Sequence, residues 1–184
     1  MKATGIVRRI DELGRIVIPK EIRRTFNIKE GSPLEIFCGD NSELVLKKYS
    51  MIFEIRDFAD EICSALFSSI GQPVLICDKE KFVACCGVSK SLFYMSEISS
   101  KLEKIIDSKR EVLLQPLSQS NMLNSTISLK KDDINTYSSQ IVIPILSQGD
   151  TYGAIICFSK EKLLTEKEIF GLKCMANFLS EKIG

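Results

Sequence analysis

The sequence of 184 residues contains no histidine, and this absence removes several kinds of chemistry at once. Without imidazole the chain has no histidine to bind zinc, to activate a serine or cysteine nucleophile, or to act as a general base. It also has no glycine-rich phosphate-binding loop and no recognisable pair of catalytic carboxylates. We therefore expect neither enzymatic activity nor a bound metal or cofactor.

Long apolar segments are missing as well. No apolar run approaches the about 18 residues that a membrane-spanning helix needs. The N-terminal stretch MKATGIVRRI has no apolar core of the kind that a secretory signal carries. These two absences predict a cytoplasmic protein.

The cysteines are odd in number, and no CxxC pair occurs among them. Most of them lie in apolar runs such as VLIC and AIICF, where a free thiol packs as a small hydrophobic side chain. A reducing compartment keeps such thiols free. We interpret them as packing residues rather than as redox or metal-binding residues: Cys38, Cys63, Cys77, Cys85, Cys86, Cys157 and Cys174.

The net charge of +1 hides an uneven distribution of basic residues. Residues 1–50 carry ten Lys or Arg against seven Asp or Glu, a balance of +3, whereas the remaining 134 residues have a balance of −2. Within residues 1–29 the balance rises to +5. A local excess of positive charge of this kind is typical of a surface that meets an anionic partner.

The first fifty residues are predicted to form short strands around a short helix. β-Branched residues and alternation favour strands, and Pro19 suits the first position of a helix because its missing N–H is not needed there. The expected elements are strands over 4–10 and 15–18, a helix over 19–26 with Ile22 and Phe26 facing the core, stop signals at Asn27 and Gly31, and a hairpin over 34–49 that turns at CGDNS.

Residues 1–50 are too few to be stable alone, because a segment of that size without disulfides or metal buries too little apolar surface. A second copy of the same segment would supply the missing cover. We therefore predict an obligate dimer through this region. The side chains that need cover are Ile6, Ile10, Ile16, Ile18, Leu34, Ile36, Leu44 and Leu46.

A helix is predicted over residues 51–71, with Ser50 as its N-cap and Gly71 as its stop. Its apolar positions step by three and four residues, which is heptad spacing. Two interpretations fit this pattern: a short coiled coil, or packing against the domain that follows. The apolar row consists of Ile52, Ile55, Ala59, Ile62 and Leu66.

Residues 72–184 are predicted to form an α/β domain of the size common in sensor proteins. The expected elements are a hairpin over 73–87, a helix over 98–108, a strand over 111–114, a hairpin over 140–159 at the centre of the sheet, and a final helix that opens with the capping box Thr165 to Glu168. The broad apolar face of the final helix fits two arrangements, packing on the sheet alone or also against a second copy.

Residues 118–139 are polar and rich in turn formers, and they fit either a lid over a pocket or a flexible connection. A pocket beneath them would be lined by Phe82, Tyr94 and Tyr137. Each of these three residues also fits an ordinary core position.

The motifs GIVRRID, LGRIVIPKEIRR and LKKY follow one another with the spacing of the AbrB class of bacterial transition-state regulators, which the chain resembles from Lys2 to Tyr49. The resemblance implies that two chains interleave their hairpins into one small β-barrel. The whole chain is similar to two-domain members of the class, whose C-terminal part is GAF-like. The expected fold class is α+β: a dimeric swapped-hairpin barrel over 1–50, a connecting helix over 51–71 and a GAF-like α/β domain over 72–184.

The resemblance also implies that basic residues of the first segment contact DNA. Guanidinium groups suit this task because they bind a phosphate or a guanine edge through two parallel hydrogen bonds, and neutralised phosphates release condensed counterions. Arg9 and Lys20, taken singly, also fit solvated surface charges. The matching arginines are Arg8, Arg15, Arg23 and Arg24, and the neighbouring basic positions are Lys2, Arg9 and Lys20.

The predicted function is therefore a DNA-binding transcriptional regulator of sporulation-stage genes, acting as activator or repressor. Little in the segment resembles a recognition helix, so we expect binding to depend on DNA shape as well as on sequence. The GAF-like domain implies sensing of a small-molecule effector or assembly, with tetramers formed through it. An antitoxin-like module with the same N-terminal fold is the alternative. We expect the protein to be associated with the nucleoid.

The acidic pair Asp11 and Glu12 stands among these basic residues. Two interpretations fit. The carboxylates orient the arginines, or they lie near the positive charges without a specific role.

Overall fold

The computed structural model describes residues 5–40, 42–115, 129 and 138–183. The chain divides into two compact units, Met1–Tyr49 and Ser50–Gly184. Within the described residues, every helix is too short or too polar to traverse a lipid bilayer.

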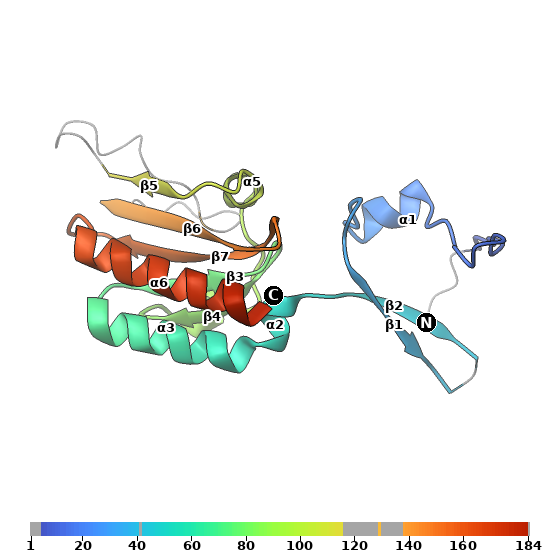
Figure 1. Cartoon of the computed structure of the whole chain (residues 1–184), viewed down its shortest axis with the longest axis horizontal. Helices are drawn as coiled ribbons and strands as arrows, with labels where there is room; N and C mark the ends of the chain where they lie inside the picture. Colours follow the sequence, from blue (N-terminus) through green and yellow to red (C-terminus); the bar gives the residue numbers. More distant parts are fainter. Residues whose placement is uncertain (1–4, 41, 116–128, 130–137, 184) are drawn as a thin grey trace. The chain divides into compact units, whose positions relative to one another are not determined.

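The first unit contains one short helix and one hairpin (Figure 1). Helix α1 spans Lys20–Thr25, and the antiparallel strands β1 and β2 span Leu34–Cys38 and Leu44–Lys48. Asn27 has the positive φ of 49°, a backbone conformation that ends a helix. The predicted helix, its stop at Asn27 and the hairpin are confirmed.

The strands predicted over 4–10 and 15–18 are not formed, since residues 5–19 contain no strand. A β-ladder needs a neighbouring strand to accept and donate the backbone hydrogen bonds. The described part of one copy provides no such neighbour for these residues, so the β-branched side chains of this segment are not sufficient to make it a strand.

The first unit buries none of its described side chains. Every residue that the structure describes between 5 and 49 is exposed or half-buried. Phe26 is 59% exposed, so the prediction that it faces a core is wrong within one copy. The exposed apolar side chains include Ile6, Val7, Ile10, Leu13, Ile16, Val17, Ile36, Phe37, Leu44 and Leu46.

The second unit is built on a five-stranded antiparallel sheet with the strand order β4-β3-β7-β6-β5. Both predicted hairpins are present, and β7 lies at the centre of the sheet, as expected for the most apolar hairpin. The strands are β3 Val74–Cys77, β4 Phe82–Cys86, β5 Val112–Leu114, β6 Ser139–Ser147 and β7 Asp150–Ser159.

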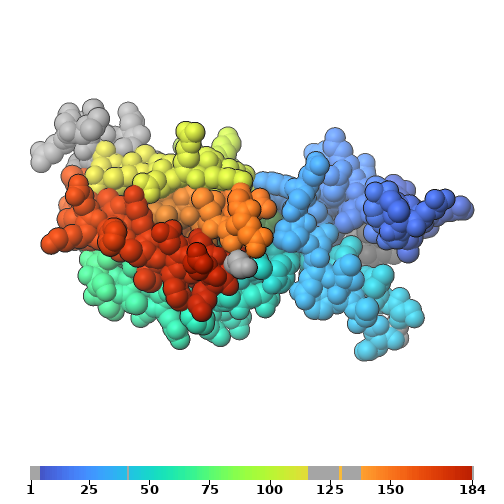
Figure 2. Space-filling model, in the orientation of Figure 1, coloured from blue at the N-terminus to red at the C-terminus, as the bar shows by residue number. Residues whose placement is uncertain are grey.

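Helices cover both faces of this sheet. One face is covered by α2, α3 and α6, and the other by α4 and α5 (Figure 1). Figure 2 shows α6 (red) beside α3 (green) on the surface of the molecule. Because both faces are covered, β3 is buried along its whole length. The helices are α2 Met51–Glu54, α3 Arg56–Ile70, α4 Lys90–Phe93, α5 Ser100–Asp107 and α6 Glu166–Ile183.

The helix predicted over 51–71 is interrupted at Ile55, which separates α2 from α3. The Ser50 side chain accepts a hydrogen bond from the Phe53 amide at 3.2 Å, and Gly71 ends α3 with a φ of 71°. Both termini are therefore as predicted. The row Ile52, Ala59, Ile62 and Leu66 is buried in the core of the second unit, which confirms the packing interpretation over the coiled coil.

Four of the seven cysteines are buried, namely Cys63, Cys77, Cys85 and Cys157. Burial raises the pKa of the Cys157 thiol to about 12 and raises the pKa values of Cys63 and Cys77 further, so these thiols stay protonated. The packing interpretation holds for these four. It also holds for the half-buried Cys86, which packs against the core of the second unit. Within one copy it is wrong for Cys38 and Cys174, which are exposed. The described part of the chain contains no group of three or more metal-ligating residues.

Candidate nucleic-acid interface

The basic residues predicted to contact DNA lie on the surface of the first unit. Arg8, Arg9, Arg15, Lys20, Arg23 and Arg24 are all exposed. Lys2 lies outside the described residues. These six predicted contact residues are therefore all accessible, as contact with a nucleic acid requires.

A tight turn over residues 11–15 carries Arg15. The carboxylate atom Oδ1 of Asp11 accepts hydrogen bonds from the amides of Leu13 at 3.0 Å and Arg15 at 2.8 Å. The Asp11 amide donates to the Arg15 carbonyl at 3.0 Å, and the Gly14 amide donates to the Asp11 carbonyl at 2.9 Å. Gly14 has a φ of 75°, which glycine adopts without the steric cost that other residues meet.

The second oxygen of Asp11 binds the Arg15 side chain. Arg15 Nε donates to Asp11 Oδ2 at 2.8 Å. The hydrogen bonds from the Arg15 amide and then from its guanidinium hold the pKa of Asp11 below its ordinary value. Of the two interpretations of the acidic pair, orientation therefore applies to Asp11. Glu12 makes no such contact with any described residue.

Helix α1 carries three further cations: Lys20 in its first turn and Arg23 and Arg24 in its last turn. Cations near a helix C-terminus interact favourably with the helix dipole. Neither arginine side chain has a hydrogen bond or ion pair to a described residue, so both guanidinium groups are available to a ligand. The sequence predicts Pro19 as the first residue of the helix. It is instead the N-cap residue, so the helix begins one residue later, at Lys20.

Arg8 has a weaker local contact, because its Nη1 donates to the carbonyl of the adjacent Val7 at 3.2 Å. In a strand over 4–10, the alternation of side chains would put Arg8 on the same face as Ile6 and Ile10. No strand forms there within one copy, and all three side chains are exposed. The residue whose role could not be decided from the sequence is Asp11, and the spacing Asp-x-x-Gly-Arg was its only signal.

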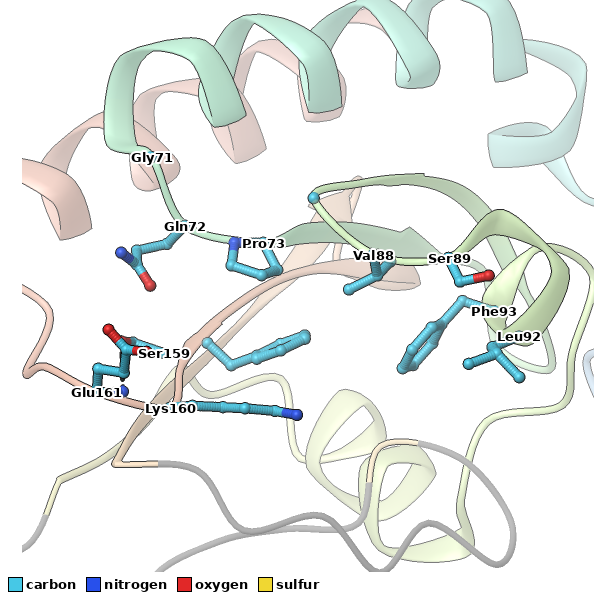
Figure 3. A pocket seen from close by; sticks show the side chains of 12 residues that line it. Gly71, Gln72, Pro73, Val88, Ser89, Leu92, Phe93, Ser159, Lys160 and Glu161 are labelled. Carbon is cyan, nitrogen blue, oxygen red and sulfur yellow. Dashed lines mark hydrogen bonds between the residues drawn. The ribbon is translucent and has the colours of Figure 1, made fainter.

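The second unit contains a cavity of about 560 Å³ where β3 begins and β4 and β7 end (Figure 3). Its two charged lining residues, Lys160 and Glu161, are exposed. The lining combines apolar side chains with polar groups, including Gln72, and places no buried charge in the cavity. The apolar lining residues are Pro73, Val88, Leu92, Phe93 and Phe158, with the hydroxyls of Ser89 and Ser159 beside them.

The residues predicted to line a pocket do not line this one. Phe82 is fully buried and packs edge-on against Phe93 at 5.5 Å between ring centroids, so it is an ordinary core residue. Tyr94 is 39% exposed and does not border the cavity. Tyr137 and nearly all of 118–139, including the predicted lid, lie outside the described residues.

Two family models match the chain. The model described as "Stage V sporulation protein T C-terminal, transcription factor" matches residues 54–184. The model described as "Antidote-toxin recognition MazE, bacterial antitoxin" matches residues 7–53.

Similar proteins and structures agree with this division. Stage V sporulation protein T of Bacillus subtilis is 45% identical over 183 residues, which cover 100% of this chain and 99% of that protein. The transition state regulatory protein AbrB of Bacillus subtilis is 59% identical over 49 residues, 27% of this chain and 50% of that protein. The GAF domain of an Acinetobacter phosphoenolpyruvate-protein phosphotransferase, at 15% identity, shares the fold with a TM-score of 0.53 over 74% of this chain and 84% of that chain.

Proposed function

The chain belongs to the stage V sporulation protein T family of transcription factors, and from this we propose that residues 1–50 carry its DNA-contacting surface. It combines an AbrB-like N-terminal domain with a GAF-like C-terminal domain. The observation that carries the proposal is the group of exposed arginines on the segment most similar to AbrB. The proposed contacts are Arg8, Arg15, Arg23 and Arg24, with Lys2, Arg9 and Lys20 beside them.

The chemistry of these side chains supports double-stranded DNA as the ligand. Arg23 and Arg24 present guanidinium groups that no described acid neutralises, and each can bind a phosphate or a guanine edge bidentately. The six-residue helix α1 is short for a helix that reads the major groove alone. Dependence on DNA shape as well as sequence is therefore part of the proposal.

A dimer through the first unit is proposed for a separate reason. The described part of residues 5–49 buries no side chain, and its exposed apolar residues include six that are more than 60% exposed: Val7, Ile10, Leu13, Val17, Ile36 and Leu44. Leaving so much apolar surface in water is unfavourable. A second copy would cover these residues and would supply partner strands to residues 5–19. It would also double every arginine on the DNA-contacting surface.

The second unit supports a further association between copies. Phe58 of α3 and Phe178 of α6 are 45% and 40% exposed, and their ring centroids lie 6.4 Å apart. Phe170, one residue after the core-facing Ile169, is 69% exposed. Phe58 and Phe178 lie side by side on the helical face, with Lys182 Nζ 5.8 and 5.6 Å from their ring centroids, and Phe170 is a further exposed aromatic side chain of α6. We propose that this helical face joins two dimers into a tetramer. We propose the cavity of this unit as the site for a small effector that carries both apolar and polar groups.

The remaining parts of the proposal follow from family membership. The family is described as one of transcription factors, so we propose no enzymatic activity. The antitoxin-like alternative rests on the match of residues 7–53 alone, whereas the match to stage V sporulation protein T covers the whole chain. A DNA-binding regulator would act in the cytoplasm, associated with the nucleoid.

The test is the salt dependence of DNA binding by Arg15→Ala and Arg23→Ala. Each substitution removes two phosphate or base contacts from a dimer, so the slope of log K against log salt concentration should fall by about 2 if both are phosphate contacts. Affinity at low salt should fall by about tenfold or more. Gel-shift titrations at several salt concentrations measure both quantities.

The matched control is Arg110→Ala, which removes the same charge from an exposed position of the second unit. Its slope and affinity should equal those of the unsubstituted protein. An unchanged slope and affinity in both Arg15→Ala and Arg23→Ala would contradict the proposed contacts.

A further inference from the structure

Arg15 differs from the other proposed DNA-contacting arginines because its guanidinium already has an acidic partner. Arg15 Nε lies 2.8 Å from Asp11 Oδ2, and the two side chains are 70% and 42% exposed. Ion pairs this exposed contribute little to folding stability. The pair therefore needs another explanation than stabilisation of the turn, which the backbone hydrogen bonds to Oδ1 already provide.

The geometry of the pair leaves one edge of the guanidinium available. An arginine side chain has five N–H donors, and Nε supplies only one of them. Asp11 occupies that donor, while the terminal atoms Nη1 and Nη2 have no hydrogen bond to a described residue. These two atoms form the edge that binds O6 and N7 of a guanine through parallel hydrogen bonds. The carboxylate thus restricts the rotation of the guanidinium and leaves its recognition edge exposed.

We propose that Asp11 is a positioning residue for DNA recognition, which holds Arg15 for bidentate contact with a guanine edge and so determines sequence preference. The inference depends on the proposed function, because it requires that Arg15 contacts DNA. Asp11 works through Arg15 and does not itself contact the duplex, since a carboxylate would be repelled by the phosphates.

The proposal predicts opposite effects of Asp11 on two kinds of binding. Its negative charge opposes attraction to phosphates, which governs binding to any sequence. Its hydrogen bond to Arg15 favours the one orientation that recognises a base. Removing the charge should therefore strengthen binding to unrelated DNA and weaken discrimination between sequences.

Asp11→Asn separates these effects because asparagine keeps the acceptor Oδ1. The hydrogen bonds from the Leu13 and Arg15 amides can persist, whereas the amide nitrogen of Asn cannot accept a hydrogen bond from Arg15 Nε. The matched control is Glu12→Gln. It removes one negative charge from the neighbouring residue, which has no hydrogen bond or ion pair to the described part of the chain.

The experiment uses the full-length protein and two duplexes of equal length and composition. One is selected by the unsubstituted protein from a random-sequence pool, and the other is its scrambled counterpart. For Asp11→Asn the ratio of the two affinities should fall by about tenfold, the lower end of what one bidentate base contact contributes. For Glu12→Gln both affinities should rise together and the ratio should not change. An unchanged ratio in Asp11→Asn would overturn the proposal.

A spectroscopic measurement on the free protein tests the pair independently of DNA. The Nε–Hε resonance of Arg15 should differ from that of a solvated arginine, and Asp11→Asn should move it to the solvated position. If the resonance shows the pair but Arg15→Ala leaves binding unchanged, the proposed function of Arg15 fails. If Arg15→Ala weakens binding but Asp11→Asn leaves the ratio unchanged, only the positioning role fails.

Arg15→Lys provides a second route should Asp11→Asn fail to fold. Lysine keeps the charge but cannot bind a guanine edge as a planar fork, so the ratio should fall about tenfold while binding to the scrambled duplex is retained. A ratio equal to that of the unsubstituted protein would overturn the proposal by this route as well.

Discussion

Gly153 lies at a position of β7 where the backbone next to it leaves no room for a side chain. A β-carbon added at this position of β7 would lie 1.9 Å from the carbonyl oxygen of Cys77 and 3.0 Å from the α-carbon of Asp78. Both neighbours are backbone atoms of the paired strand β3 or the residue after it. Backbone atoms in a paired sheet cannot move aside as a flexible side chain can, so only glycine fits.

Gly153→Ala should therefore lower the free energy of unfolding by about 3 kcal/mol or more, through forced movement of β3 away from β7. Gly171→Ala is the matched control, because an added β-carbon in α6 meets no atom within 4 Å. It should raise stability by about 0.5–1 kcal/mol, since alanine favours helix more than glycine does. Chemical denaturation of the two variants measures both changes, and equal stabilities would contradict the expectation.

At the scale of single elements, α6 begins with a set of reciprocal hydrogen bonds. The Thr165 amide donates to Glu168 Oε2 at 2.6 Å, and the Thr165 hydroxyl donates to the same oxygen at 2.9 Å. In the other direction, the Glu168 amide donates to Thr165 Oγ1 at 3.4 Å. Lys162 Nζ lies 2.8 Å from Glu168 Oε1. Partial burial raises the pKa of Glu168, but the hydrogen bonds from Lys162 and Thr165 outweigh it and lower the pKa below the ordinary value. The capping box predicted from the sequence is confirmed.

Glu168→Gln should reduce stability at neutral pH by about 0.5–1.5 kcal/mol through loss of these charge-assisted bonds. A pKa lowered by folding means that the carboxylate stabilises the protein above its unfolded pKa, and this contribution is lost as the pH falls through the folded pKa. The stability difference from the unsubstituted protein should therefore shrink in acid. Thermal unfolding at neutral and acidic pH measures it.

Glu166→Gln removes a neighbouring carboxylate from the first turn of α6 without disturbing the capping bonds, and it serves as the control. Its effect should be smaller than that of Glu168→Gln at neutral pH. The difference in stability between Glu168→Gln and the unsubstituted protein should not stay constant over the whole pH range. A constant difference would contradict a stabilising role of the Glu168 charge.

At the scale of the whole molecule, the two units differ in what they can do alone. The second unit buries two apolar clusters, one on each face of its sheet. The first unit buries no described side chain. The proposed dimer through residues 1–50 and the proposed tetramer through α3 and α6 therefore rest on different surfaces, and a substitution in one should leave the other association intact.

Phe178→Glu should convert a tetramer of the full-length protein into a dimer that still binds DNA. A charge at this position would be buried if α6 packed against a second copy. Lys182, whose Nζ lies 5.6 Å from the Phe178 ring centroid, could pair with it, but removing such a pair from water is costly and opposes association. Analytical ultracentrifugation measures the change in mass. Leu113→Glu, an equally exposed apolar position on β5, should leave the tetramer intact. Dissociation of Phe178→Glu to monomers, or a tetramer that persists, would contradict the separation of the two surfaces.

Much of this protein is determined by local sequence. Ser50 and Gly71 mark helix ends because capping depends on hydrogen bonds and backbone angles within a few residues. The hairpins follow from alternation and turn residues close to one another in the chain. The exposed arginines and the AbrB-like motifs are likewise visible without a structure, because they are properties of residue type and spacing.

Other features were decided only by the tertiary structure, because they depend on residues that are distant in the chain or on a partner that one copy does not contain. Residues 5–19 form no strand, since a β-ladder needs a neighbour that their β-branched side chains cannot provide. The cavity lies where three strands meet, and its lining comes from segments far apart in sequence. The contact between Asp11 and Arg15 is local in sequence. It could be recognised only in the structure, because the backbone angles of the turn at Gly14 set the 2.8 Å distance to Nε, which residue type and spacing do not specify.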